Sequence, residues 1–160
     1  MVRTEIQLFL RNAPGELGRL AGALSKARIN IDALTIQDAS AYVQALFKAR
    51  GKSLKRVAPA ASYGSMKKDS ADFALIRLLV DQTDQAIDTL SKDGYLFDIV
   101  PVIALEIDNR PGTLAKMAEK FGQEKININY VYGSALPGGK KSLFVFSPED
   151  IESAAKIFAK

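Results

Sequence analysis

One stretch of this sequence occurs twice, and it decides the fold. Residues 10–36 read LRNAPGELGRLAGALSKARINIDALTI, and residues 107–133 read IDNRPGTLAKMAEKFGQEKININYVYG. A constant shift of 97 residues superimposes the two stretches without a gap, so that Asn12 falls on Asn109. Because an internal repeat at a fixed spacing indicates a duplicated structural unit, we expect two related units in this chain of 160 residues.

Each copy predicts a strand, a tight turn, an amphipathic helix and a second strand. In the first copy, residues 4–11 alternate apolar and polar side chains, which indicates a half-buried strand. Pro14 suits the first position of a helix, since its missing N–H costs nothing there. Leu20 and Leu24 follow at helical spacing, and a second strand begins at Ile29. The second copy repeats this order around Pro111.

The segments outside the repeat complete each unit. Residues 72–81 and 95–99 read as strands on either side of a helix that begins near Thr83. In the second half, a third strand precedes a last helix, which Pro148 starts and Ser147 caps. Each half therefore reads β-α-β-β-α, and the first half adds a fourth strand.

This order of elements predicts an α+β fold. It consists of two ferredoxin-like βαββαβ units in tandem, each an antiparallel sheet with helices on one face. The first unit spans residues 1–99 and the second spans residues 100–160. The second unit is expected to lack its last strand, unless another chain supplies that edge.

Composition excludes several classes of function. The chain has no cysteine and no histidine, which removes disulfides, the commonest metal ligands and the commonest general base. It has no glycine-rich nucleotide-binding motif and no carboxylates at metal-ligand spacing. We therefore expect no enzyme, no cofactor and no metal site. The sequence shows no apolar run of membrane-spanning length and no signal peptide, so we expect no membrane partner and favour the cytoplasm.

The positive charge is concentrated in one segment. Residues 41–69 contain seven basic residues and one acidic residue, although the net charge of the whole chain is only +4. This segment forms an insertion between the second and third strands of the first unit, where the second unit has a short loop. It could be a solvated loop, recruit a protein partner or contact phosphates; a nucleic-acid partner is the least favoured of these.

The motif Asn-x-Pro-Gly-x-Leu before a helix, followed by Ile-Asn-Ile at the next strand, resembles the ACT domain family. The whole chain is similar to stand-alone tandem ACT proteins, which pair two such units without an enzyme domain. The resemblance implies a small regulatory module that binds an amino acid or a similar effector. One departure is that Arg28 and Lys125 stand where glycine commonly ends the helix. Since a left-handed residue with a side chain costs about 1 kcal/mol, the turn could close differently here.

The resemblance places the ligand at the interface between units, between the turn of one unit and strand two of another. The residues that it implies are Asn12, Gly15, Leu17, Asn30 and Ile31 in the first unit, and Asn109, Gly112, Leu114, Asn127 and Ile128 in the second. The start of a helix offers free N–H groups and a positive dipole to a carboxylate, and glycine lets a ligand approach the backbone.

Each candidate also has a purely structural explanation. The asparagines of the turns could brace them, and those before strand two could cap the exit of the helix. The glycines could serve helix packing, and the helical spacing of Leu17 and Leu114 favours the core. We expect a non-catalytic sensor of a small neutral or branched amino acid that forms a homodimer. The alternative is an adaptor whose basic insertion recruits a partner.

Overall fold

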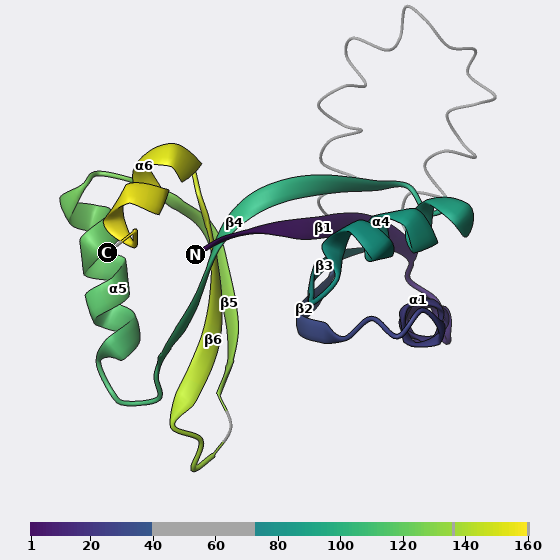
Figure 1. Cartoon of the computed structure of the whole chain (residues 1–160), viewed down its shortest axis with the longest axis horizontal. Helices are drawn as coiled ribbons and strands as arrows, with labels where there is room; N and C mark the ends of the chain where they lie inside the picture. The colour runs from purple at the N-terminus through teal and green to yellow at the C-terminus, as the bar shows by residue number, and fades with distance from the viewer. Residues whose placement is uncertain (40–72, 136, 160) are drawn as a thin grey trace, which may run out of the picture.

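The computed structural model describes residues 1–39, 73–135 and 137–159. The basic insertion predicted at 41–69 lies outside these residues. The elements are β1 (Val2–Arg11), α1 (Glu16–Lys26), β2 (Ile31–Asp38), β3 (Phe73–Val80), α4 (Thr83–Lys92), β4 (Phe97–Asp108), α5 (Thr113–Gln123), β5 (Ile128–Ala135), β6 (Lys141–Pro148) and α6 (Ile151–Ile157) (Figure 1). The predicted α+β fold with tandem ferredoxin-like units is confirmed.

The described strands form one antiparallel sheet in the order β2-β3-β1-β4-β6-β5. Strand β4 belongs to both units. Its first part pairs with β1, with Ile99 opposite Ile6, and its second part pairs with β6, with Ile103 opposite Phe146. The two strands predicted on either side of residue 100 are therefore one continuous strand, and Pro101 lies within it.

The expectation that the second unit lacks a last strand holds for the described residues, and the structure shows what stands in its place. The beginning of β1 lies beside β4, with Val2 opposite Ile103. The N–H of Ala104 donates to the carbonyl of Met1 over 3.0 Å. The first strand of unit one thus covers part of the edge that a fourth strand of unit two would occupy.

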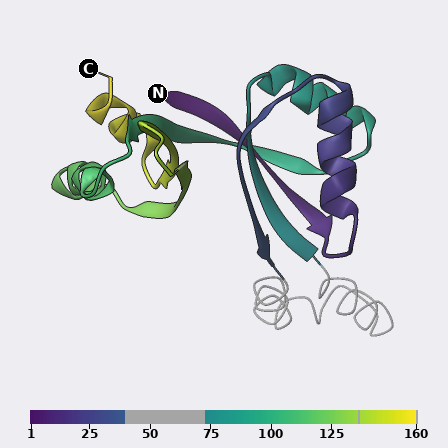
Figure 2. The same cartoon turned by 90° about the horizontal axis from the view of Figure 1, so that it is seen from below.

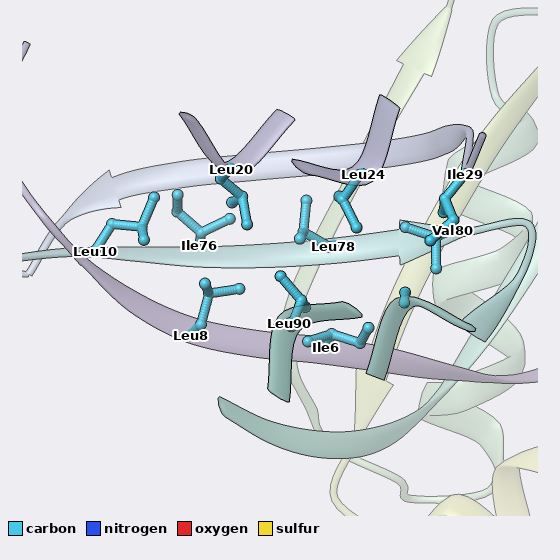
Figure 3. Packing of buried hydrophobic residues seen from close by; sticks show 11 residues of the cluster. Ile6, Leu8, Leu10, Leu20, Leu24, Ile29, Ile76, Leu78, Val80 and Leu90 are labelled. Carbon is cyan, nitrogen blue, oxygen red and sulfur yellow. The ribbon is translucent and has the colours of Figure 1, made fainter. Parts of the chain in front are cut away.

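Each unit packs its helices on one face of its own part of the sheet (Figure 2). In the first unit, alternate residues of β1 and β3 meet the buried faces of α1 and α4 (Figure 3). In the second unit, the core is built on Phe121 and Phe146, whose ring centroids lie 5.3 Å apart. A third cluster lies between the units: Ala33 and Leu79 of the first unit pack against residues of β4 and β6, including Val145.

Both repeated helices begin two residues later than predicted. Gly15 and Gly112 take left-handed φ angles of 91° and 84° as the N-cap residues, so α1 and α5 start after them. Pro14 and Pro111 therefore lie in the preceding turn and not at the first helical position. A left-handed residue at this point favours glycine because a Cβ would crowd the following carbonyl.

The start of the last helix was also predicted wrongly. Ser147 and Pro148 belong to strand β6, and α6 begins at Ile151. The cap is Asp150, whose carboxylate accepts a hydrogen bond of 3.0 Å from the N–H of Ser153. This bond holds the pKa of the Asp150 carboxyl below its usual value. Asp satisfies a free helix N–H as well as Ser does, and its charge also suits the helix dipole.

The helix exits close as they would with glycine, although they carry side chains. Arg28 and Lys125 adopt left-handed φ angles of 59° and 57°. After α1, the N–H of Arg28 donates to the carbonyl of Ser25 and the N–H of Ile29 donates to that of Leu24, which is the hydrogen-bond pattern of a Schellman motif. The same pattern follows α5, so the alternative closure suggested by the sequence is wrong.

We predict that Lys125→Gly raises the free energy of unfolding by about 1 kcal/mol, because glycine removes the cost of a left-handed side chain. Lys116→Gly is the matched control. It makes the same chemical change inside α5, where glycine is expected to cost about 1 kcal/mol. Urea denaturation of the two variants measures both effects, and a destabilising Lys125→Gly would contradict the strain at this exit.

Candidate functional site

The two predicted turns present uncapped helix starts. Neither α1 nor α5 has a side chain that accepts a hydrogen bond at its N-cap position. A Cβ placed on Gly15 or Gly112 would meet no atom within 4 Å. The glycines therefore do not serve close packing here. They leave open space beside backbone N–H groups that an anion can approach.

The two turn asparagines differ in their surroundings. The N–H of Asn109 donates to the carbonyl of Lys140 over 3.0 Å, and its Nδ2 donates to the carbonyl of Gly139 over 3.1 Å. Asn109 thus joins its turn to the loop between β5 and β6, which agrees with a bracing role. Asn12, its counterpart in the first unit, is exposed.

The two leucines of the motif are not core residues. Leu17 is 39% exposed and Leu114 is 40% exposed, whereas Leu20 and Leu24 further along α1 are buried. The expectation that helical spacing places both leucines in the core is wrong. Both side chains therefore remain accessible beside the glycine turns.

The asparagines before strand two link neighbouring elements. Asn30 donates its N–H to Oδ1 of Asp81 over 2.9 Å and accepts the N–H of Asp81 on its carbonyl over 3.1 Å. Its Nδ2 donates to Oδ1 of Asp32 over 3.2 Å. Asn127 accepts the N–H of Glu149 over 2.9 Å. Since backbone groups close both helix exits, the capping alternative is not supported.

The isoleucines at the start of strand two pack against the hydrophobic cores, and Ile31 also lines a groove. Ile31 packs at the border of the first core, and Ile128 packs against the second core. Ile31 and Asn30 also line a groove of about 660 Å³ between the units, with Ala104 and Glu106 of β4 on its other side. The structure thus brings strand two of unit one to the first strand of unit two.

The helix starts lie elsewhere in the molecule. Figures 1 and 2 both show α1 and α5 at opposite ends, with the shared strand β4 running between the two units. A single chain therefore does not place the glycine turn of one unit beside strand two of the other. The ten predicted residues form separate groups: two turns and two strand starts.

Sequence reasoning missed a buried carboxylate at the contact between the units. Glu5, on the face of β1 away from the helices, has no exposed surface. The Tyr130 hydroxyl and Nε2 of Gln7 donate to its Oε1 over 2.6 and 2.7 Å, and the Tyr132 hydroxyl donates to its Oε2 over 2.7 Å. The Arg77 guanidinium lies 4.1 Å from the centroid of the Tyr130 ring. These donors and the nearby cation offset the cost of burying a charge.

The signal that could have revealed this contact lies in the repeat itself. The shift of 97 residues that aligns the motifs places Glu5 on Val102, which is fully buried between the units. The alternation in β1 indicates one face toward the helices and leaves the other face to solvent by default. The apolar Val102 indicates that this face of β4 is covered, and the repeat extends the same expectation to the face of β1 that carries Glu5.

Burial and the contact with Glu5 change the pKa of Tyr130 and Tyr132. Burial, together with the hydrogen bond to Glu5 and its negative charge, raises the pKa of the Tyr132 hydroxyl well above its ordinary value of 10. The same causes, burial first, raise the pKa of Tyr130. Both hydroxyls therefore remain protonated and act as donors to the carboxylate over the physiological range.

Comparison with known proteins identifies the family. The fold and the paired glycine turns define a tandem ferredoxin-like module. A family model described as "ACT domain pair" matches residues 49–160, and the chain belongs to this family. Comparison with curated protein sequences gives no match.

Solved structures show the same fold. A protein from Bacteroides thetaiotaomicron has a TM-score of 0.72 at 24% identity, with 99% of this chain and 88% of that chain covered. The ligand-free regulatory subunit of aspartate kinase from Thermus thermophilus has a TM-score of 0.57 at 14% identity, with 99% and 93% covered. The corresponding subunit from Thermus flavus has a TM-score of 0.51 at 16% identity, with 99% and 94% covered.

Two kinds of feature are absent from the part of the chain that the structure describes. None of its helices is both long enough and apolar enough to cross a membrane. No cluster of three or more acidic side chains is placed to hold a metal ion within residues 1–39, 73–135 and 137–159.

We predict a defined alkaline dependence from the Tyr132 contact. Because the pKa of Tyr132 is raised in the folded state, the unfolded chain loses this proton first, and the free energy of unfolding falls as pH rises above 10. Tyr132→Phe removes up to about 1.4 kcal/mol per pH unit from this slope. Urea denaturation between about pH 9 and 11.5 measures it, and comparison with the parent chain cancels the lysine titrations. Parallel profiles would contradict the assignment.

Proposed function

We propose that this chain is a non-catalytic regulatory protein that binds an amino acid at the interface between ACT units. The observation that carries the proposal is the pair of helix starts without a side-chain cap. Each follows a left-handed glycine on which an added Cβ would meet no atom within 4 Å. A carboxylate group is the natural ligand of such a helix start. Membership of the ACT domain pair family supports this function. The named regulatory subunits of aspartate kinase support a regulatory use of the same fold.

The site requires a second chain, because the turns of one chain lie away from strand two of its other unit. We therefore propose a homodimer in which a turn of one chain, Gly15 or Gly112, faces strand two of the partner. The remaining predicted residues, Asn12, Leu17, Asn30, Ile31, Asn109, Leu114, Asn127 and Ile128, are proposed to line this interface. We propose that residues 1–99 and residues 100–160 form the two units. We also propose that the protein acts in the cytoplasm.

The regulatory mechanism follows from this arrangement. A ligand held between two chains stabilises one arrangement of the units over another, by its difference in affinity for the two. An adaptor role for the basic insertion at 41–69 remains the alternative. It rests on the seven basic residues of that segment, which lie outside the described part of the structure.

We predict that at least one amino acid raises the thermal midpoint of the purified chain. A ligand at 100 times its dissociation constant adds about 2.7 kcal/mol, which shifts the midpoint of a chain of this size by about 5–10 °C. Screening all twenty amino acids at millimolar concentration by differential scanning fluorimetry measures this. If none shifts the midpoint, the sensor function is wrong.

The double variant Gly15→Asp/Gly112→Asp tests the turns. Each aspartate adds a negative charge and a side chain where the ligand carboxylate would lie, so the ligand-induced shift is expected to disappear. Gly94→Asp/Gly138→Asp is a matched control, because these glycines also have positive φ angles and no atom within 4 Å of an added Cβ. Loss of the shift in both variants, or in neither, would argue against binding at the turns.

The proposed dimer has its own measurement. Light scattering coupled to size exclusion should give twice the mass of one chain. If the parent is in equilibrium with monomer, the fraction of dimer should increase when the stabilising amino acid is added. A monomer that binds the amino acid with full affinity would contradict a site shared between chains.

A further inference from the structure

Strand β4 has a stretch of edge that no described strand occupies. Its residues Ile103–Asp108 pair with β6 on one edge. On the other edge, the ladder with β1 reaches Val2 opposite Ile103 and closes at Met1. Within the described part of the chain, residues 105–108 therefore pair on one side and are open on the other.

The last pair of that ladder shows which backbone groups face the open edge. The N–H of Ala104 donates to the carbonyl of Met1 over 3.0 Å, and the Met1 ammonium donates to the carbonyl of Ala104 over 3.1 Å. Alternate residues of a strand direct their backbone groups to the same edge. The N–H and C=O of Glu106 therefore face the open edge. The N–H of Asp108 also faces it, whereas the Asp108 carbonyl accepts from Arg110 over 2.9 Å.

The core of the second unit is less complete at the same edge. The shift of 97 residues relates Leu105 to Leu8 of the first unit. Leu8 is 1% exposed, and Phe97 of β4 lies opposite it. Leu105 packs against the second core but is only partly buried. Because the ladder with β1 closes at Ala104, none of the described residues stands opposite Leu105 on this edge.

Open space lies beside this edge. The groove between β2 and β4, of about 660 Å³, is lined by Leu105 and Glu106 of β4 and by Ile31 of β2, among others. Glu106 is exposed, whereas the Asp108 carboxylate is already paired with Lys141 over 2.8 Å. The edge is therefore accessible to an incoming backbone and presents an exposed carboxylate to it.

The other free stretch of β4 is protected. Residues 97–101 pair with β1, whereas the pairing with β6 begins at Ile103. By the same alternation, Pro101 faces the edge away from β1. Its missing N–H removes a donor from any incoming ladder, as is common on exposed edges. The stretch at residues 105–108 has no proline, so it keeps its donors.

We propose that the edge of β4 at residues 105–108 binds an extended strand of a partner protein, which continues the ladder of β1. The incoming strand runs antiparallel to β4 and bonds to the free backbone groups of Glu106 and Asp108. A basic residue fits opposite Glu106, since opposite charges across a ladder attract each other. The residue before it points to the face of the sheet that carries α5 and α6. An apolar side chain there covers Ile107 and reaches Leu105 diagonally.

This surface is distinct from the helix starts of the proposed amino-acid site. It gives the regulatory protein a place to hold a second protein through main-chain bonds, with specificity from one basic and one apolar side chain of the partner. The proposal does not depend on amino-acid binding, so either can fail alone.

The test measures the fluorescence anisotropy of labelled peptides titrated with the whole chain. The parent peptide is GSVTFK with fluorescein at its N-terminus and an amide at its C-terminus. It ends at the lysine opposite Glu106, because Met1 occupies the ladder beyond. Methylation of the lysine backbone nitrogen removes the donor to the Glu106 carbonyl and should weaken binding about tenfold. Methylation of the phenylalanine nitrogen is the matched control. That N–H points away from β4, so the affinity should not change.

A charge exchange tests the pairing of side chains. Glu106→Lys should weaken the lysine peptide about fivefold and strengthen the matching glutamate peptide, GSVTFE, by a similar factor. Glu119→Lys makes the same change at an exposed position of α5. It is the control and should alter neither affinity.

The outcomes that overturn the proposal are distinct from those of the amino-acid screen. The strand site is wrong if no peptide binds at millimolar concentration, or if the two methylated peptides bind equally well. Equal effects of Glu106→Lys and Glu119→Lys would show a general attraction of charge and would overturn it as well. None of these results decides the amino-acid function, which the thermal shift tests separately.

Discussion

The hydrogen-bond ladder of strand β4 is the constraint on which the rest of the structure depends. One part of this strand completes the sheet of the first unit, and the other part begins the sheet of the second unit. Because a single strand serves both, the units have no linker about which they could rotate freely. The contact between them is therefore part of the fold and not a docking of two finished domains. The buried Glu5 and the groove between β2 and β4 have defined positions as a result.

The periodicity of apolar side chains predicted which helices and strands form, but it predicted their first and last residues less well. Strand alternation and the helical spacing of Leu20 and Leu24 located β1 and α1 because these signals arise within one element. The helix starts were misplaced, since the rule for proline at the first helical position ignores a left-handed glycine that follows it. The cap of α6 was misplaced because Ser and Asp are both good caps, and only the end of strand β6 decides between them.

The sequence predicted which residues form the turns and strand starts of the candidate site, but not how these groups are placed relative to one another. The repeat identified the turns and the strand starts, and the structure shows them as separate groups. The burial of Glu5 and the groove between β2 and β4 depend on how the second unit folds against the far face of β1. That packing follows from the path of β4 through both units. The periodicity of side chains within one element does not predict this path. A position-by-position comparison of the two copies points to it, since Val102, at the position equivalent to Glu5, is apolar.

The tyrosine contact has a practical consequence for spectroscopy. The chain has five tyrosines and no tryptophan, so tyrosine emission is not masked by energy transfer to an indole. Two of the five, Tyr130 and Tyr132, bond to a carboxylate at the junction of the units, and Arg77 lies against one ring. A carboxylate that accepts a phenolic hydrogen bond quenches the fluorescence of that phenol. The protein therefore carries its own optical reporter, placed where any movement of one unit against the other would be registered without an added label.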